Sequence, residues 1–126
     1  LEALELGKRS AKQELLALPD GLSVEHVMPQ KWETNWPLVT VDAEIIANRK
    51  RLLHSIGNLT LVTQNFNSAL SNEAFSVKRS EIVTTSLLTL NAYFQKFGDK
   101  DVWDEQQITM RAKELFPLAL KIWARP

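Results

Sequence analysis

The sequence has 126 residues and no cysteine. This absence excludes disulfides, thiolate zinc sites and a cysteine nucleophile, and it leaves no requirement for an oxidising compartment. Lys and Arg number 15, as do Asp and Glu, so no excess of positive charge marks the whole chain as a nucleic-acid binder. No apolar run reaches the ~18 residues of a membrane span, and no signal-peptide pattern opens the chain. The remaining composition, 44% hydrophobic and 24% charged, is that of an ordinary globular protein.

The length predicts one domain over residues 1–126, large enough for a core without disulfides or structural metals. Within it we expect a core unit at about 22–80 and helical flanks at 2–18 and 82–123. The chain starts at Leu1 rather than Met, which suggests a fragment of a longer polypeptide, or a processed or trimmed chain.

Two short apolar segments, residues 23–30 and 56–63, have the alternation of strands. Pro29 ends the first because proline cannot donate to a strand ladder. A polar run, residues 64–72, follows the second directly, and Asn65 or Asn67 is well placed to cap a short helix there. The order predicts a small antiparallel hairpin followed by a helix.

Residues 30–40 have no clear period and are expected to form an irregular loop held by its tryptophans. Helical periods fill most of the remaining chain, so the predicted fold class is mainly α with one small antiparallel β-hairpin, an α+β fold. Asp42 is a candidate cap for a helix ending near Leu53. Residues 73–97 are expected to be helical in two pieces, and 104–123 to form the longest helix, kinked at Pro117. The core candidates of these last two segments are Phe75, Ile82, Leu87, Leu90 and Phe94, then Ile108, Leu115, Leu118, Ala119 and Ile122.

His26 is the first residue that suggests chemistry. A strand histidine among apolar neighbours is most often a partly buried residue bonded to a backbone carbonyl. A neutral imidazole is also the side chain suited to taking a proton from water near pH 7. Asn58 and Asn67 fit a turn and a helix cap, but phosphodiester cleavage also needs a cation held by hard oxygen ligands beside the base.

The ordered set Glu25-His26-x-x-Pro29, then Asn58-Leu59, then Asn67 resembles the HNH (His-Me finger, ββα-metal) nuclease motif. The resemblance implies that His26 is the general base and that Asn58 braces the loop between the strands. It also implies that Asn67 holds a divalent ion, Mg²⁺ or alternatively Mn²⁺, with Glu25 as helper. Glu25 stands where Asp is usual, and the Cys-x-x-Cys zinc staples of many members are absent.

The resemblance extends over nearly all of residues 20–125. Pro29-Gln30, the nearby Trp32, the run from Leu53 to Leu61, Phe75 with Lys78, and the closing helix up to Trp123 together are similar to the C-terminal domain of GmrSD-type restriction enzymes. That family implies DNA as substrate, a bacterial cytoplasmic anti-phage role, and a sensor or NTPase domain or subunit outside this chain.

Other polar side chains keep two interpretations each. His54 is either a helix-end residue that braces the loop or orients the site by a hydrogen bond, or it is a direct metal ligand. Trp32 and Trp36 either anchor a loop or stack on a nucleobase. The basic clusters fit either solvated helix faces or contacts to a DNA backbone; their tentative contact residues are Arg49, Arg51, Lys78 and Arg79.

Two alternatives to a nuclease remain open on the sequence. One is a non-catalytic DNA- or partner-binding module that keeps the HNH shape. The other is an all-helical interaction domain in which Glu25, His26 and the asparagines are turn and capping residues.

Overall fold

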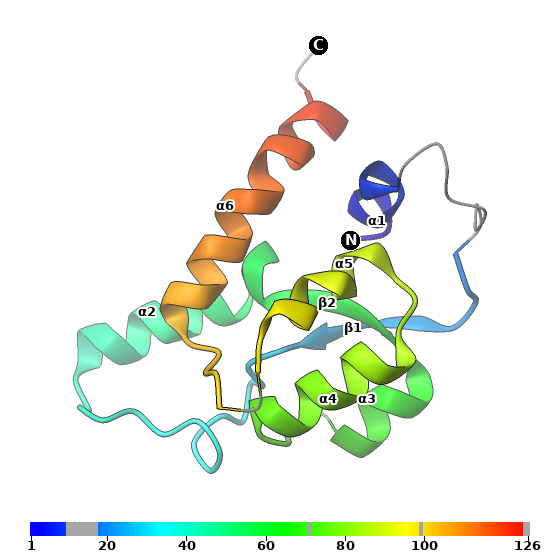
Figure 1. The fold of residues 1–126 in the computed structure, drawn as a ribbon. Coiled ribbons are helices and arrows are strands. Elements are labelled where there is room, and N and C mark those ends of the chain that lie inside the picture. The colour runs from blue at the N-terminus through cyan, green and yellow to red at the C-terminus, as the bar shows by residue number, and fades with distance from the viewer. Residues whose placement is uncertain (10–17, 71, 99, 125–126) are drawn as a thin grey trace.

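A computed structural model of the chain describes residues 1–9, 18–70, 72–98 and 100–124, without the side chains of residues 67–69. The elements in chain order, with η for 3₁₀ turns, are α1 (Glu2–Lys8), β1 (Leu22–His26), α2 (Ala43–Leu53), η1 (Ile56–Asn58), β2 (Leu59–Thr63), α3 (Gln64–Leu70), α4 (Phe75–Thr85), α5 (Thr89–Ala92), η2 (Tyr93–Lys96) and α6 (Glu105–Ile122). Figure 1 shows the two strands as the only β element among several helices over this part of the chain, which confirms the predicted α+β class.

The strands pair antiparallel, in a register that runs from Leu22 opposite Thr63 to His26 opposite Leu59. The connection between them, residues 27–58, contains α2, and β2 runs directly into α3. The predicted strand–strand–helix order is therefore confirmed. The all-helical alternative is wrong, because Glu25 and His26 lie in a paired strand.

Two aspartates begin the helices that the sequence placed after them. The Asp42 carboxylate accepts a hydrogen bond from the Glu44 backbone N–H at 2.7 Å, and Asp104 accepts one from the Gln107 N–H at 3.0 Å. Each satisfies a backbone donor that a helix N-terminus leaves unpaired. Pro117 lies inside α6 without ending it.

The larger hydrophobic core lies where α4, η2 and the segment before α6 meet. Its aromatic centre consists of Phe75, Phe94, Phe97 and Trp103, whose ring centroids lie 5.3–6.5 Å apart. Such offset or edge-on contacts add to the burial energy of the rings. The end of β1 leads into this core through Val27 and Met28, both fully buried.

A second, smaller core joins α1, α5 and α6 through Leu4, Leu90 and Leu115. The helix period predicted burial correctly for most of the candidates, but Leu87 is 88% exposed. Leu87 lies between α4 and α5, where the helix is interrupted, so the period of one helix does not continue into the next.

The first flanking helix is anchored through a carboxylate. Glu5 is fully buried and accepts hydrogen bonds from the backbone N–H groups of Thr89 and Leu90, both at 3.0 Å, at the start of α5. The predicted helix over 2–18 is observed as α1 up to Lys8, and its part at 10–17 lies outside the described residues.

The tryptophan loop before α2 is attached to the core as expected. Trp36 is buried, and Trp32 is partly buried beneath Arg49, whose guanidinium carbon lies 4.6 Å from the ring centroid. These positions favour loop anchoring over nucleobase stacking. Within the described ranges, no helix combines the length and apolar character that crossing a bilayer requires.

Candidate functional site

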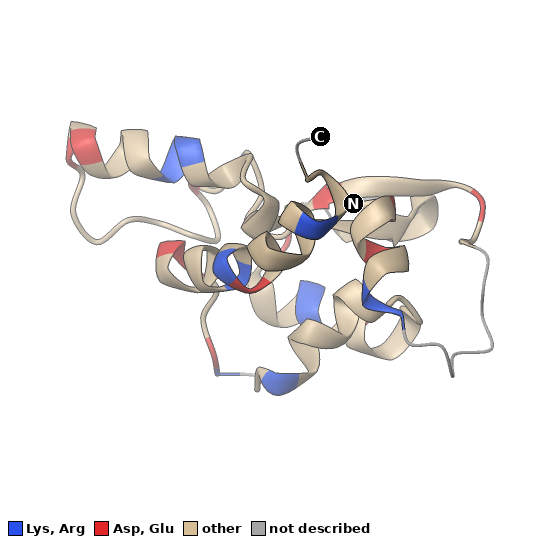
Figure 2. Ribbon diagram, turned by 90° about the horizontal axis from the view of Figure 1, so that it is seen from above, with Lys and Arg blue, Asp and Glu red and all other residues tan. Residues whose placement is uncertain are grey.

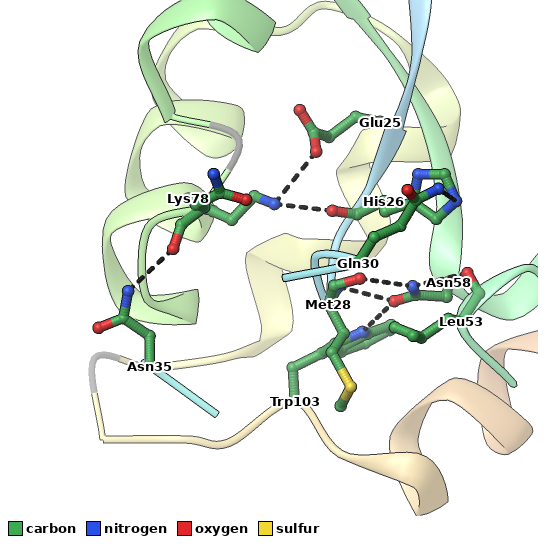
Figure 3. Close-up of polar contacts among 10 residues, drawn as sticks. Glu25, His26, Met28, Gln30, Asn35, Leu53, Asn58, Lys78 and Trp103 are labelled. Atoms are coloured by element: carbon green, nitrogen blue, oxygen red, sulfur yellow. Dashed lines mark hydrogen bonds and ion pairs between the residues drawn. The ribbon is translucent and has the colours of Figure 1, made fainter. Parts of the chain in front are cut away.

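Strand β1 separates its last two side chains, because successive residues of a strand point to opposite faces. Glu25 is buried, at 3% exposure, whereas His26 is half-buried. Figure 3 shows Glu25 directed toward Lys78 and the His26 ring lying on the other side of the strand. The two residues that the motif places together therefore face different surroundings.

Glu25 forms a buried ion pair with Lys78 of α4. The Lys78 ammonium donates to Glu25 Oε1 at 3.1 Å and to the His26 backbone carbonyl at 2.7 Å, and its side chain is fully buried. Burial raises the pKa of the Glu25 carboxyl, and Lys78 opposes that rise. Burial likewise lowers the pKa of Lys78, and Glu25 opposes that fall. The pair attaches the end of β1 to α4.

His26 faces the other histidine of the chain. Its Nε2 lies 3.2 Å from His54 Nδ1 and 3.4 Å from the side-chain nitrogen of Gln30. Burial lowers the pKa of His26 below its ordinary value of 6.5, and the nearby His54 and Lys78 lower it further. A lowered pKa keeps the imidazole neutral at pH 7, which is the form that can accept a proton.

Asn58 occupies a fully buried position between the two strands. Its Oδ1 accepts from the Met28 backbone N–H at 2.8 Å and from the Trp103 indole N–H at 3.0 Å. Its Nδ2 donates to the carbonyls of Met28 at 2.9 Å and Leu53 at 3.0 Å. All four contacts are visible in Figure 3. One amide thus joins the segment after β1, the end of α2 and the segment before α6.

The turn that carries Asn58 is pressed against α6. A Cβ atom added to Gly57 would lie 2.0 Å from the Ile108 carbonyl oxygen, so only glycine fits. Arg111, also in α6 and 1% exposed, donates to the carbonyls of Gly57 at 3.1 Å and Leu59 at 2.7 Å. Burial lowers the pKa of Arg111 to about 10.

Asn67 lies on α3, the helix that directly follows β2, and its side chain is outside the described residues. An amide oxygen there has the chemistry that Mg²⁺ prefers. Glu25 is a less suitable metal ligand, because its charge is already paired with Lys78. Its second oxygen, Oε2, accepts no hydrogen bond within the part of the chain that the structure describes. Ligation by Glu25 would require the carboxylate to leave that pair.

Comparison with known proteins identifies the family of this chain. The sequence model of the family described as GmrSD restriction endonucleases, C-terminal domain, matches residues 2–118. The chain belongs to this family. Dicer-like protein 2 of Coccidioides immitis (strain RS) is 34% identical over 76 residues, which are 57% of this chain and 5% of that protein. This chain therefore spans only a small part of that relative's length. No solved structure gives a significant match.

The structure corrects two of the four DNA contacts predicted for this GmrSD C-terminal domain. Arg49 and Lys78 are buried, so neither can reach a phosphate. Arg49 donates to Glu105 and to the Trp36 carbonyl, and Lys78 is paired with Glu25. Arg51 is exposed and donates to Asn48 at 2.8 Å, while Arg79 is half-buried. Figure 2 shows Lys and Arg distributed over several elements of the described chain, with Asp and Glu between them.

Three residues of the site were given no role from the sequence. Gln30 follows Pro29 in the motif, and its spacing of four from His26 is a signal that a turn would bring the two side chains together. Trp103 and Arg111 had no local signal, because both act on a turn far away in the chain. His54 was expected as a brace, and the structure places it directly against His26.

Proposed function

We propose that this domain hydrolyses DNA phosphodiester bonds with His26 as the general base. The supporting observation is the placement of a half-buried imidazole with lowered pKa at the end of β1, in a ββα unit of a restriction endonuclease family. Its Nε2 is on the side that faces exposed groups, where water and substrate have access.

In the proposed reaction, His26 Nε2 takes a proton from the attacking water. In this structure that atom lies 3.2 Å from the His54 nitrogen and 3.4 Å from the Gln30 nitrogen, so water reaches its single lone pair only in place of these contacts. The Lys78 ammonium holds the backbone of the same residue, since it donates to the His26 carbonyl at 2.7 Å. The base thus has a supported backbone, and its ring nitrogen becomes available when the exposed His54 and Gln30 side chains move aside.

Asn67 is the proposed holder of a divalent ion, with Mg²⁺ as the first expectation and Mn²⁺ as the second. Such an ion neutralises charge on the scissile phosphate and the departing oxygen. In our proposal Glu25 supports β1 through Lys78 and reaches the ion only if that pair opens.

We also propose that this domain binds DNA weakly and depends on a sensor or NTPase domain, or a partner subunit, for its target. The net charge is zero, so few phosphates can be neutralised. Two of the expected phosphate contacts are buried, which supports the same conclusion. A role in bacterial cytoplasmic defence against phage is part of this proposal.

Plasmid cleavage with Mg²⁺, with Mn²⁺ and with EDTA tests the proposal. His26→Ala should lower the cleavage rate by about 10²–10⁴-fold, the usual contribution of general acid–base catalysis. Circular dichroism must show that the variant is folded. A folded, fully active His26→Ala domain would refute the assignment.

The metal role of Asn67 has its own test. Cleavage by Asn67→Ala should recover in part as Mg²⁺ is raised, while Asn58→Ala should not, because Asn58 acts on structure. Metal binding without cleavage, or DNA binding without either, would instead support the non-catalytic module.

A further inference from the structure

The two histidines of the chain are in contact with each other. The sequence contains two histidines and no cysteine, so these two rings are its imidazole ligands and it has no thiolate ligand. They are 28 positions apart, yet His26 Nε2 lies 3.2 Å from His54 Nδ1, with the ring planes at 89°.

This separation is that of a hydrogen bond, and it is also close to the spacing of two nitrogen ligands on one ion, which would replace that bond. Zinc binds imidazole nitrogen at about 2.0–2.1 Å in tetrahedral geometry, which places two such nitrogens about 3.3 Å apart. His54 is exposed and follows the last residue of α2, so its ring can turn toward a shared ion without disturbing the core. The His26 backbone is meanwhile held by the Lys78 ammonium.

The neighbourhood supplies a further donor. The Gln30 side-chain nitrogen is 3.4 Å from His26 Nε2, and rotation of the amide would present its oxygen instead. Water can complete the coordination, because Gln30 and His54 are both exposed. The nearest buried charges, those of Glu25 and Lys78, form a pair with each other.

We propose that His26 and His54 form a binding site for a borderline transition-metal ion, with Zn²⁺ as the reference ligand. Imidazole nitrogen suits zinc, copper and nickel, whereas magnesium prefers oxygen, so this site is chemically distinct from the one proposed at Asn67. Occupancy would take the Nε2 lone pair of His26 and block its use as a base. Only this inhibitory consequence rests on the proposed function.

Titration calorimetry with Zn²⁺ and visible absorption with Co²⁺ test the site directly, with the amino terminus acetylated to remove a competing nitrogen. The parent chain, with both histidines present, should bind one equivalent of Zn²⁺ or Co²⁺. His54→Ala and His26→Ala should each weaken binding by more than about tenfold, since losing even an outer-shell partner of a metal ligand costs 10–100-fold. Arg51→Ala, on the exposed surface one turn earlier in α2, is the matched control and should bind as the parent does.

The outcome that overturns the site is binding to His54→Ala as tight as to the parent chain, or no binding to the parent at all. Activity is a separate readout. Micromolar Zn²⁺ should inhibit Mg²⁺-dependent cleavage by the parent more than tenfold, and should inhibit His54→Ala less, each relative to its own uninhibited rate. Zinc binding without any cleavage refutes the proposed function and leaves the site standing; cleavage without zinc binding does the reverse.

Discussion

The two faces of β1 differ in how their polar groups are satisfied. On the buried face, Glu25 and Lys78 pair at full burial, and nearby Asn58 uses both ends of its amide in four hydrogen bonds. On the open face, His26 Nε2 lies 3.2 Å from His54 and 3.4 Å from Gln30, and both of these partners are exposed. Contacts of the first kind hold geometry, and contacts of the second kind can be exchanged for substrate, water or metal. The buried face should therefore control folding, and the open face chemistry.

The strongest way to break the buried face is Asn58→Ala. Four buried groups lose their partner, and each stranded group costs about 1–3 kcal/mol, so we expect the largest loss of unfolding free energy of any change considered. Urea denaturation followed by tryptophan fluorescence measures it. Asn48→Ala, an exposed asparagine in α2, is the control and should change stability by less than about 0.5 kcal/mol. Equal effects of the two substitutions would contradict the role of Asn58.

Lys78→Met should cost about 3–5 kcal/mol, because it leaves the Glu25 carboxylate buried without a counter-ion. Adding Glu25→Gln to the same chain should restore part of the loss, since the unpaired charge is then removed. Urea denaturation of the single and double variants measures both effects. A double variant no more stable than Lys78→Met would argue against the ion pair as the cause.

Lys78→Met should also change how the stability of the folded domain depends on pH. Burial raises the pKa of Glu25 and Lys78 lowers it, so without Lys78 the folded-state pKa lies further above the ordinary 4.5. The folded state then holds its proton more tightly than the unfolded state does. Stability should therefore fall as pH rises from 4.5 through the raised pKa, and the loss should be complete above it. Melting temperatures of Lys78→Met and the parent from pH 4 to 8 test this sign.

Gly57→Ala should cost about 1–3 kcal/mol or more, because the added carbon meets the Ile108 carbonyl oxygen at 2.0 Å and must displace α6. Gly98→Ala is the matched control, since its nearest neighbour, Asp101 Oδ2, is at 3.6 Å. Thermal melts of the two variants should separate clearly. If both melt with the parent, the turn is not held against α6 as described.

The smallest effect belongs to the open face. His54→Ala should change stability little, since His54 is exposed, but it should move the pH dependence of cleavage. His54 helps to lower the pKa of His26, so its removal should raise that pKa toward 6.5 and move the rising limb of the cleavage rate to higher pH. Rates from pH 5 to 8.5 at saturating Mg²⁺ measure the midpoint. A midpoint that stays in place or moves down would exclude this influence of His54.

Local signals predicted the elements of this fold well. The predicted Asp42 cap depends on a backbone group two residues away, so its pattern can be seen in a short window. The hairpin followed from alternation and the helices from their period. The exposure of Leu87 was missed because a helix period says nothing about where one helix stops and another begins.

Two of the four predicted phosphate contacts, Arg49 and Lys78, were wrong for a different reason. Arg49 and Lys78 appear in basic clusters, and a basic cluster usually lies on a solvated face. Both are instead buried, because partners distant in the chain satisfy them: Glu105 for Arg49 and Glu25 for Lys78. In both cases the carboxylate that pairs with the buried charge is more than 50 positions away, so a sequence window does not contain it.

What the sequence by itself determined is the set of elements, the family, and the residue types of the site, since periods, caps and ordered motifs are properties of neighbouring residues. Only the tertiary structure decided which face each polar side chain uses. It placed Glu25 with Lys78 on the buried face, joined three segments through Asn58, and brought His54 to within 3.2 Å of His26. Apart from the Asn58–Leu53 bond, these pairings join residues that are 28 to 53 positions apart, and packing of the whole chain is what brings such residues together.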